Sequence, residues 1–171
     1  FSPRKNIKGL IEAYYKIYRK LSKPQKLVIV GKHGKSYDDY RQLVNKLGID
    51  DYVVFTGYIP VNDLPIFYNG ASLFVYPSFY EGFGLPPLEA MACATPTITS
   101  NVTSIPEIVD GCAMTVNPYD IDELSEAMHI ILEDTKLWEH YSLNGFKRSR
   151  EFSWKQTARE TLKVLSQFAK A

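Results

Sequence analysis

The sequence contains no long apolar run: its longest uninterrupted apolar stretch is about five residues, far short of the roughly 20 residues that cross a bilayer as a helix. No charged-then-apolar segment of the export type opens the chain. Cysteine is scarce too, since the 171 residues include only two, too few for a disulfide scaffold or a four-cysteine zinc site. We therefore expect a protein of a reducing compartment, with the cytoplasm as the default location.

A large excess of charge of one sign is also absent. Twenty basic and nineteen acidic side chains leave a formal net charge of +1, which removes the electrostatic reason to propose a nucleic-acid partner. The few histidines give no metal-ligand pattern, because His129 and His140 lie in helical segments away from the predicted loops. Cys93 lies on an apolar helix without a nearby histidine, which favours a buried thiol over a nucleophile. We therefore expect no metal ion.

What the sequence does contain is an alternation of strand-like and helix-like segments. Short, nearly continuous apolar runs predict strands at residues 27–30, 52–55, 73–76, 97–99 and 113–116. Apolar residues at helical spacing occur at 7–21, at 40–47 up to Gly48, and after residue 120. This alternation predicts the α/β class, a Rossmann-like doubly wound parallel sheet. Because a helix comes first, we expect that the first strand precedes Phe1 and that the chain is a fragment of a longer protein.

Two helix starts carry the spacing of capping boxes. Asp120 is followed by Glu123, and Ser153 by Gln156. The first box predicts a helix whose apolar stripe faces the core. The second predicts a closing helix that runs almost to the end of the chain, with the apolar stripe Trp154, Ala158, Leu162, Leu165 and Phe168.

The most informative stretch is residues 78–92, SFYEGFGLPPLEAMA, which follows a predicted strand. A helix is expected to open at Pro86 or Pro87, where the lost N–H has no partner in any case. The glycines before it allow a tight turn with exposed backbone amides, which suits a ligand with hydroxyls or anionic oxygens. Ligands of open α/β sheets lie at the carboxyl ends of the strands. The loops at 31–35, 57–60, 77–85, 100–105 and 117–119 should therefore share one edge with this turn.

Two carboxylates flank the turn. Glu81 precedes it, and Glu89 is expected in or near the first turn of the helix, so both can point towards one pocket over the sheet edge. Carboxylates accept strong hydrogen bonds, and pairs of sugar or ribose hydroxyls can supply them. On spacing alone an alternative is as good, with Glu81 as a solvated loop residue and Glu89 as a complement to the helix dipole.

Cations gather at the start of the first predicted helix. Arg4, Lys5 and Lys8 oppose the helix dipole, at a cost of roughly 0.3–1 kcal/mol each unless an anion is bound. A diphosphate would supply that anion. The alternative is a solvated basic face, which we favour for Lys8.

The loop after the second predicted strand is a candidate for base recognition. Its residues 57–60, GYIP, offer backbone groups that could read a base edge, with Tyr58 or Ile59 packed on the ring. Tyr58 is explained equally well as an ordinary surface aromatic.

Glu81 and Glu89, with seven residues between them that include Gly-Phe-Gly-Leu-Pro and with Ala-Met-Ala after them, form a specific string. It resembles the signature of retaining, nucleotide-sugar-dependent glycosyltransferases of the GT-B fold, glycosyl transferases group 1 (family 4), which include many mannosyl- and glucosyltransferases. Residues 4–6, 54–59, 105–109 and 152–154 agree in order and spacing with other segments of that family's C-terminal domain. One departure is Ala94, where the family usually has Gly, and we expect it to tighten packing after the helix.

The resemblance implies that residues 1–171 form a single nucleotide-sugar-binding domain, the C-terminal half of a GT-B enzyme. The protein would transfer a hexose from a nucleoside diphosphate sugar, GDP-mannose first and a UDP-hexose second, without a metal or other cofactor. The saccharide or lipid-linked acceptor would be held by an N-terminal domain that has no counterpart here. The resemblance leaves room for peripheral association of the full-length enzyme with the inner face of the membrane.

The resemblance also implies roles for individual residues. Glu81 and Lys5 are the expected catalytic residues: Glu81 orients the donor sugar, and Lys5 stabilises the leaving diphosphate together with loop amides. Glu89 is expected to hold the ribose hydroxyls. The other expected donor-binding residues are Arg4, Tyr58, Ile59, Gly82, Phe83, Gly84 and Leu85.

Two other classes stay open on the sequence. The first is a nucleotide-sugar-binding or regulatory module of GT-B architecture without catalysis. The second is a flavodoxin-like signalling domain, which needs a phosphorylatable aspartate after a strand. No predicted strand ends in Asp, which counts against the second class.

Overall fold

The computed structural model describes residues 2–168, so Phe1 lies outside the described residues. The strands lie within two residues of the expected ranges: β1 (Leu27–Val30), β2 (Val53–Gly57), β3 (Phe74–Tyr76), β4 (Thr97–Ser100) and β5 (Met114–Val116). The α-helices are α1 (Ile7–Ile17), α2 (Tyr37–Leu47), α3 (Leu64–Gly70), α4 (Leu85–Ala92), α5 (Ile105–Val109), α6 (Ile121–Glu133), α7 (Thr135–Ser149) and α8 (Trp154–Phe168). Short 3-10 turns lie at η1 (Pro3–Lys5), η2 (Asp50–Tyr52) and η3 (Val61–Asp63).

The strand pairs are parallel, which confirms the predicted α/β class. β1 pairs with β2, and β3, β4 and β5 pair in that order. Among the described residues no ladder joins β1 to β3. In a doubly wound sheet of order 3-2-1-4-5-6 the first strand lies between these two groups. The expectation that such a strand precedes Phe1 stays a prediction.

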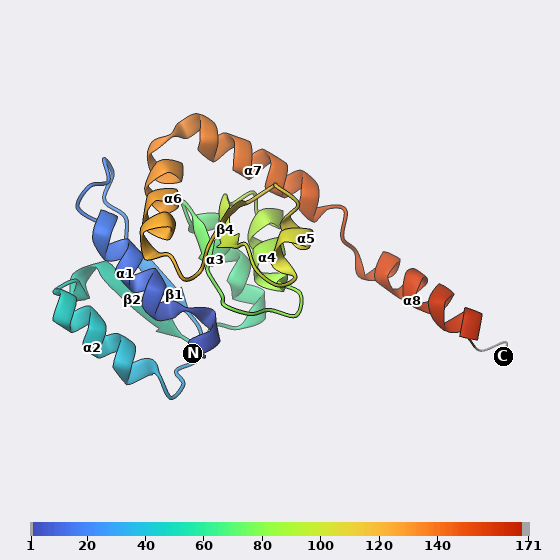
Figure 1. The fold of residues 1–171 in the computed structure, drawn as a ribbon, viewed down its shortest axis with the longest axis horizontal. Helices are drawn as coiled ribbons and strands as arrows, with labels where there is room; N and C mark the ends of the chain where they lie inside the picture. Colours follow the sequence, from blue (N-terminus) through green and yellow to red (C-terminus); the bar gives the residue numbers. More distant parts are fainter. Residues whose placement is uncertain (1, 169–171) are drawn as a thin grey trace.

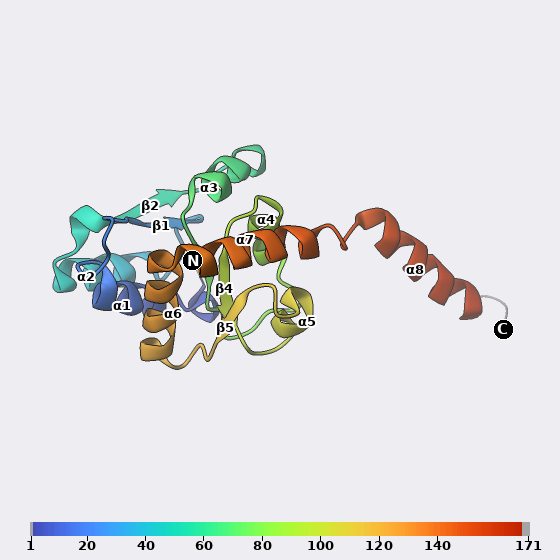
Figure 2. The same ribbon diagram turned by 90° about the horizontal axis from the view of Figure 1, so that it is seen from above.

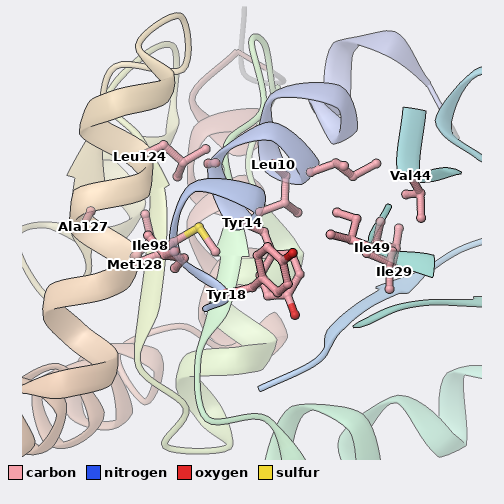
Figure 3. Close-up of a cluster of buried hydrophobic side chains, with 14 of the residues drawn as sticks. Leu10, Tyr14, Tyr18, Ile29, Val44, Ile49, Ile98, Leu124, Ala127 and Met128 are labelled. Atoms are coloured by element: carbon pink, nitrogen blue, oxygen red, sulfur yellow. The ribbon is translucent and has the colours of Figure 1, made fainter. Parts of the chain in front are cut away.

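The main core lies between the sheet and a layer of helices. α1 and α2 lie together on one side of the β1–β2 pair, with α6 beside α1 (Figures 1 and 2). Leu10 of α1, Val44 of α2, Ile98 of β4 and Leu124 of α6 converge there and are buried (Figure 3). Each such side chain contributes roughly 1.5–3 kcal/mol by leaving water. The core therefore fixes the strands whose carboxyl ends carry the candidate site.

A smaller core anchors the helix of the informative motif. Met91 of α4 packs with Ile105, Val109 and Ala113, all of them buried. α4 also packs against α7 along its length. The start of α4 is consequently held in a fixed place relative to β3 and β4.

The two predicted capping boxes form only in part. The Asp120 carboxylate accepts a hydrogen bond from the N–H of Glu123 at 2.9 Å, and Ser153 Oγ accepts one from the N–H of Gln156 at 3.1 Å. The Glu123 side chain, however, accepts from the N–H of Asn117 at 3.0 Å, and the Gln156 side chain bonds along its own helix. Each signature correctly predicts a helix start, but the reciprocal bond is replaced by another.

α1 differs from expectation, since it ends at Ile17, although Leu21 beyond it still packs on the core. α7 contains His140, which the sequence places in a helical segment without giving that helix bounds. A Cβ at Gly145 would lie 3.1 Å from Met91 Cγ, so this glycine allows α7 to approach α4 closely.

α8 extends away from the rest of the protein (Figure 1). The predicted apolar stripe is present, but Trp154 is 78% exposed and Phe168 is 75% exposed. None of the residues of α8 is buried. The predicted helix is confirmed, and within residues 2–168 it faces no core.

Ala94, just after α4, has a φ of 57°. This left-handed conformation costs a residue with a Cβ roughly 1 kcal/mol or more, whereas glycine adopts it freely. The consequence of alanine at this position is therefore backbone strain. The tighter packing that we expected after the helix stays a prediction.

Candidate functional site

Two cations and one carboxylate meet where the loop after β3 passes η1. The Glu81 carboxylate accepts a hydrogen bond from Arg4 Nη1 on Oε2 and one from Lys5 Nζ on Oε1, each at 2.7 Å. Glu81 is only 8% exposed, whereas the Lys5 and Arg4 side chains are 29% and 48% exposed. The carboxylate therefore lies behind two cations that still reach solvent. We call Arg4, Lys5 and Glu81 the charged cluster.

Hydrogen bonds hold residues 4–6 in place, which positions Arg4 and Lys5 in the charged cluster. η1 precedes α1, and Asn6 caps α1 by accepting a hydrogen bond from the N–H of Gly9 at 3.2 Å. The Asn6 side chain also donates to the Pro118 carbonyl at 2.7 Å, and the Phe79 N–H donates to the Arg4 carbonyl at 2.9 Å. Arg4 and Lys5 thus lie in a turn of their own before α1. The anion that pairs with these two cations is the Glu81 carboxylate, which the sequence did not predict.

The cluster keeps a positive charge. Burial acts to raise the pKa of Glu81, but hydrogen bonds from Lys5 and Arg4 outweigh it and hold the pKa below its ordinary value of 4.5. Glu81 is therefore ionised at neutral pH and balances only one of the two cations. A partly buried site with unbalanced positive charge attracts an anion.

Tyr76, the last residue of β3, contacts Lys5 in two ways. Its hydroxyl accepts a hydrogen bond from Lys5 Nζ, and Nζ lies 4.6 Å from the centroid of the ring. Burial and the nearby charge of Glu81 raise the pKa of Tyr76, so the hydroxyl stays neutral. Sequence reasoning missed this residue, and its position at the carboxyl end of a strand was the available signal.

The backbone around Glu81 is held by the loop after β4. Ser104 Oγ donates to the carbonyl oxygens of Glu81 and Phe83 at 3.0 and 3.1 Å. Thr103 Oγ1 accepts from the N–H of Glu81 at 3.3 Å, and Thr103 itself has a φ of 59°. A β-branched residue rarely adopts that conformation. The sequence placed this loop at the shared edge but did not identify its contacts with the motif.

The turn after Glu81 depends on Gly84. Its φ is 115°, and a Cβ there would lie 2.5 Å from Ile105 Cδ1, so conformation and space both favour glycine. Gly82 differs, since its φ is not in the left-handed region and nothing lies within 4 Å of its Cβ position. The fold therefore does not require glycine at position 82. The space beside Gly82 is open to a ligand.

Glu89 lies in a different environment from Glu81. α4 begins at Leu85, one residue before the expected Pro86. Glu89 follows the first turn directly and so lies near it, as expected. The Glu89 carboxylate is exposed and accepts a hydrogen bond from the Tyr68 hydroxyl of α3 at 2.8 Å. The two carboxylates of the motif therefore have separate partners in the free protein.

The remaining predicted residues do not join the charged cluster. Tyr58 follows β2 and is 69% exposed, and Ile59 beside it is half-buried. Phe83 is 44% exposed, with its ring edge-on to Phe152 at 6.1 Å between centroids. Leu85 opens α4 and is exposed as well. Lys8 lies on the solvated face, as expected.

The predictions about metals and thiols concern other parts of the molecule. Cys93 is a free, half-buried thiol, less buried than expected, and burial raises its pKa. Across residues 2–168 no group of three or more His, Cys, Asp and Glu side chains is placed to hold a metal ion. The same residues include no helix that is long and apolar enough to cross a membrane.

The parallel α/β fold of this chain is that of the C-terminal half of the GT-B architecture. The chain belongs to the family of glycosyl transferases group 1, whose model matches residues 1–148. This membership excludes the flavodoxin-like alternative.

Individual proteins support the same assignment. The chain is 39% identical over 160 residues to O-antigen chain mannosyltransferase B of Escherichia coli, covering 94% of this chain and 42% of that protein. The solved C-terminal domain of LpcC, a glycosyl transferase group 1 family protein from Francisella tularensis, is 27% identical with a TM-score of 0.78, over 88% of this chain and 80% of that chain. Anabaena HepE in complex with UDP and glucose has the same fold, with a TM-score of 0.86 at 23% identity, over 98% of this chain and 46% of that chain. The chain thus spans less than half the length of the mannosyltransferase it matches.

Proposed function

We propose that the protein is a retaining hexosyltransferase and that residues 1–171 are its single donor-binding domain. The donor is a nucleoside diphosphate hexose, GDP-mannose in first place and a UDP-hexose in second. A saccharide or lipid-linked acceptor would be held by a further, N-terminal domain. The observation that carries the proposal is the charged cluster, which gathers Arg4, Lys5 and Glu81 at the carboxyl edge with a net positive charge.

In this proposal the two cations receive the diphosphate of the donor. Lys5, Arg4 and the amides of the turn at Gly82 to Gly84 stabilise the negative charge that develops on the leaving nucleoside diphosphate. No metal or other cofactor is needed for that step. The start of α4 adds the positive end of a helix to the same place.

Glu81 is proposed to orient the donor sugar through its hydroxyls. In the free protein both of its oxygens are engaged, by Arg4 and Lys5. A diphosphate that takes over these cations would release the carboxylate and let it turn to the sugar. Glu89 would hold the ribose, while Tyr58 and Ile59 would pack on the base, and Phe83 and Leu85 would border the donor.

The identity of the donor rests on relatives. The similarity to an O-antigen chain mannosyltransferase supports mannose as the transferred sugar. The complex of HepE with UDP and glucose supports a nucleotide-sugar site in this fold. A polysaccharide-synthesising enzyme of this kind would work in the cytoplasm, with peripheral membrane contact where its acceptor is lipid-linked.

A thermal-shift panel tests the donor site. GDP-mannose, UDP-glucose, UDP-N-acetylglucosamine, the free diphosphates and the nucleosides are each added at the same concentration, and a ligand present at 100 times its dissociation constant stabilises the protein by about 2.7 kcal/mol. We expect GDP-mannose to give the largest shift and Lys5→Ala to reduce it. No shift with any nucleotide would contradict the proposal.

The second candidate function is a nucleotide-sugar-binding or regulatory module without catalysis. This chain spans 42% of the length of the mannosyltransferase relative. A donor-binding half of that size is compatible with the hexosyltransferase and with the non-catalytic module. Sugar transfer to a saccharide acceptor by the full-length protein, lost in Glu81→Ala, separates the two. Donor binding without transfer would favour the module.

A further inference from the structure

Lys5 has two partners of different kinds. Glu81 Oε1 is a charged acceptor at 2.7 Å, and the Tyr76 hydroxyl is a neutral acceptor on the adjoining strand. If Glu81 turns to the donor sugar, as proposed above, Lys5 loses the charged partner. Of the two partners, only the Tyr76 hydroxyl then keeps the Lys5 ammonium in place.

Tyr76 is built as a fixed anchor. It ends β3, where its backbone pairs with Thr99 of β4, and its ring stacks on Phe74 with centroids 6.0 Å apart and planes at 21°. Lys5, in contrast, carries a long flexible side chain that loses rotamer freedom when it is ordered. A rigid contact made before the ligand arrives lowers the entropy lost on binding.

A neutral anchor also leaves the charge of Lys5 available. The raised pKa of Tyr76 keeps its hydroxyl protonated, so the hydroxyl oxygen holds the ammonium as a neutral dipole. A second carboxylate at this place would cancel the charge that the diphosphate needs.

We propose that Tyr76 is a positioning residue of the donor site, which holds Lys5 towards the diphosphate when Glu81 is released. The inference rests on the proposed function. It assigns Tyr76 an effect on one part of the ligand, the diphosphate, and through one residue, Lys5.

The test is a calorimetric comparison of nucleoside diphosphate and nucleoside, with the base taken from the thermal-shift panel. Tyr76→Phe keeps the ring and removes the hydroxyl. We expect it to weaken diphosphate binding about three- to tenfold and to leave nucleoside binding unchanged. In a Lys5→Ala background the same substitution should have no further effect, because the group that it positions is gone.

Tyr14→Phe is the matched control. Tyr14 is a buried tyrosine whose hydroxyl donates to the Gln25 carbonyl at 2.7 Å. Tyr14→Phe therefore measures the effect of losing a tyrosine hydroxyl that has only a structural role. Unchanged diphosphate binding in Tyr76→Phe, equal weakening of both ligands, or an undiminished effect in the Lys5→Ala background would each overturn the role of Tyr76. Failure of the native protein to bind any nucleoside diphosphate would instead overturn the proposed donor site, and this inference with it.

Discussion

The two glutamates of the motif share a short stretch of chain and have opposite surroundings. Glu81 is buried, bonded to two cations, and held through its own backbone by Thr103 and Ser104. Glu89 is exposed on α4 and has the Tyr68 hydroxyl as its side-chain partner. The spacing of the two residues is a poor guide to this difference, because burial and partners come from segments far away in sequence.

Glu81 is already held by other protein groups, whereas the exposed Glu89 is accessible to a ligand. Glu81 lies in a network that exists before any ligand arrives, so changes there should affect folding, charge and chemistry together. Glu89 can meet a ligand without giving up a buried contact, so changes there should affect binding alone.

Glu81→Ala has the largest expected effect. Sugar transfer by the full-length protein should fall by a factor of about a hundred or more, as for the loss of a group that acts in the transition state. The affinity for the free nucleoside diphosphate should change far less. Steady-state kinetics and calorimetry on the same preparation measure the two quantities.

The same variant should also lose stability. Removing the carboxylate leaves Arg4 and Lys5 without their partner, at a cost of about 1–2 kcal/mol, since both cations can turn to solvent. Glu89→Ala serves as the control, with an unfolding free energy close to that of the native protein. Equal losses of stability in the two variants would contradict the comparison.

Glu89→Ala should weaken nucleotide binding about tenfold, with or without an attached sugar, because its proposed partner is the ribose. The 2′-deoxy nucleotide should bind the native protein and the variant with more similar affinities. Titration calorimetry with the free nucleotide measures this effect. Unchanged affinity for the ribonucleotide would remove Glu89 from the site.

The two glycines of the turn sharpen the division between fold and ligand. Gly84→Ala should lower the free energy of unfolding by about 1–2 kcal/mol, because φ is 115° and Ile105 must move. Gly82→Ala should leave stability unchanged, since its Cβ meets nothing, and should weaken donor binding. Chemical denaturation measures the free energy of unfolding of the two variants, and calorimetry measures their donor affinity. A loss of stability in Gly82→Ala would contradict the claim that the fold does not require glycine at position 82.

The smallest effect is the pH dependence of stability. The folded pKa of Glu81 is lowered, so its contribution to stability is present above the ordinary value of 4.5 and is lost as the pH falls through the lowered pKa. Glu81→Gln lacks this contribution. The difference in unfolding free energy between native protein and Glu81→Gln should therefore shrink below about pH 4.5. A difference that stays constant down to pH 2 would contradict the ion pairing.

Much of the fold follows from the sequence because its signals are local. Nearly continuous apolar runs predict the five described strands to within two residues, and Asp120 and Ser153 mark helix starts correctly. For α7 the sequence indicated only that His140 lies in a helical segment, without the bounds of that helix. α8 shows the limit of amphipathic patterns, since Leu162 and Phe168 form an apolar stripe without indicating what covers it.

The site could be predicted less completely. The motif located Glu81, and the cations of Arg4 and Lys5 suggested an anion nearby. That this anion is Glu81 in the free protein depends on a contact between residues 76 positions apart, which no local pattern encodes. The contacts of Tyr76 with Lys5 and of Ser104 with the motif depend on the sheet and its loops in the same way.

The most direct test of the charged cluster as the diphosphate site is a crystal structure of the protein with the nucleoside diphosphate that binds best. We expect phosphate oxygens within about 2.7–3 Å of Lys5 Nζ and of the Arg4 guanidinium, with Glu81 released from at least one of these cations. A diphosphate bound elsewhere, with both ion pairs of Glu81 intact, would contradict this assignment.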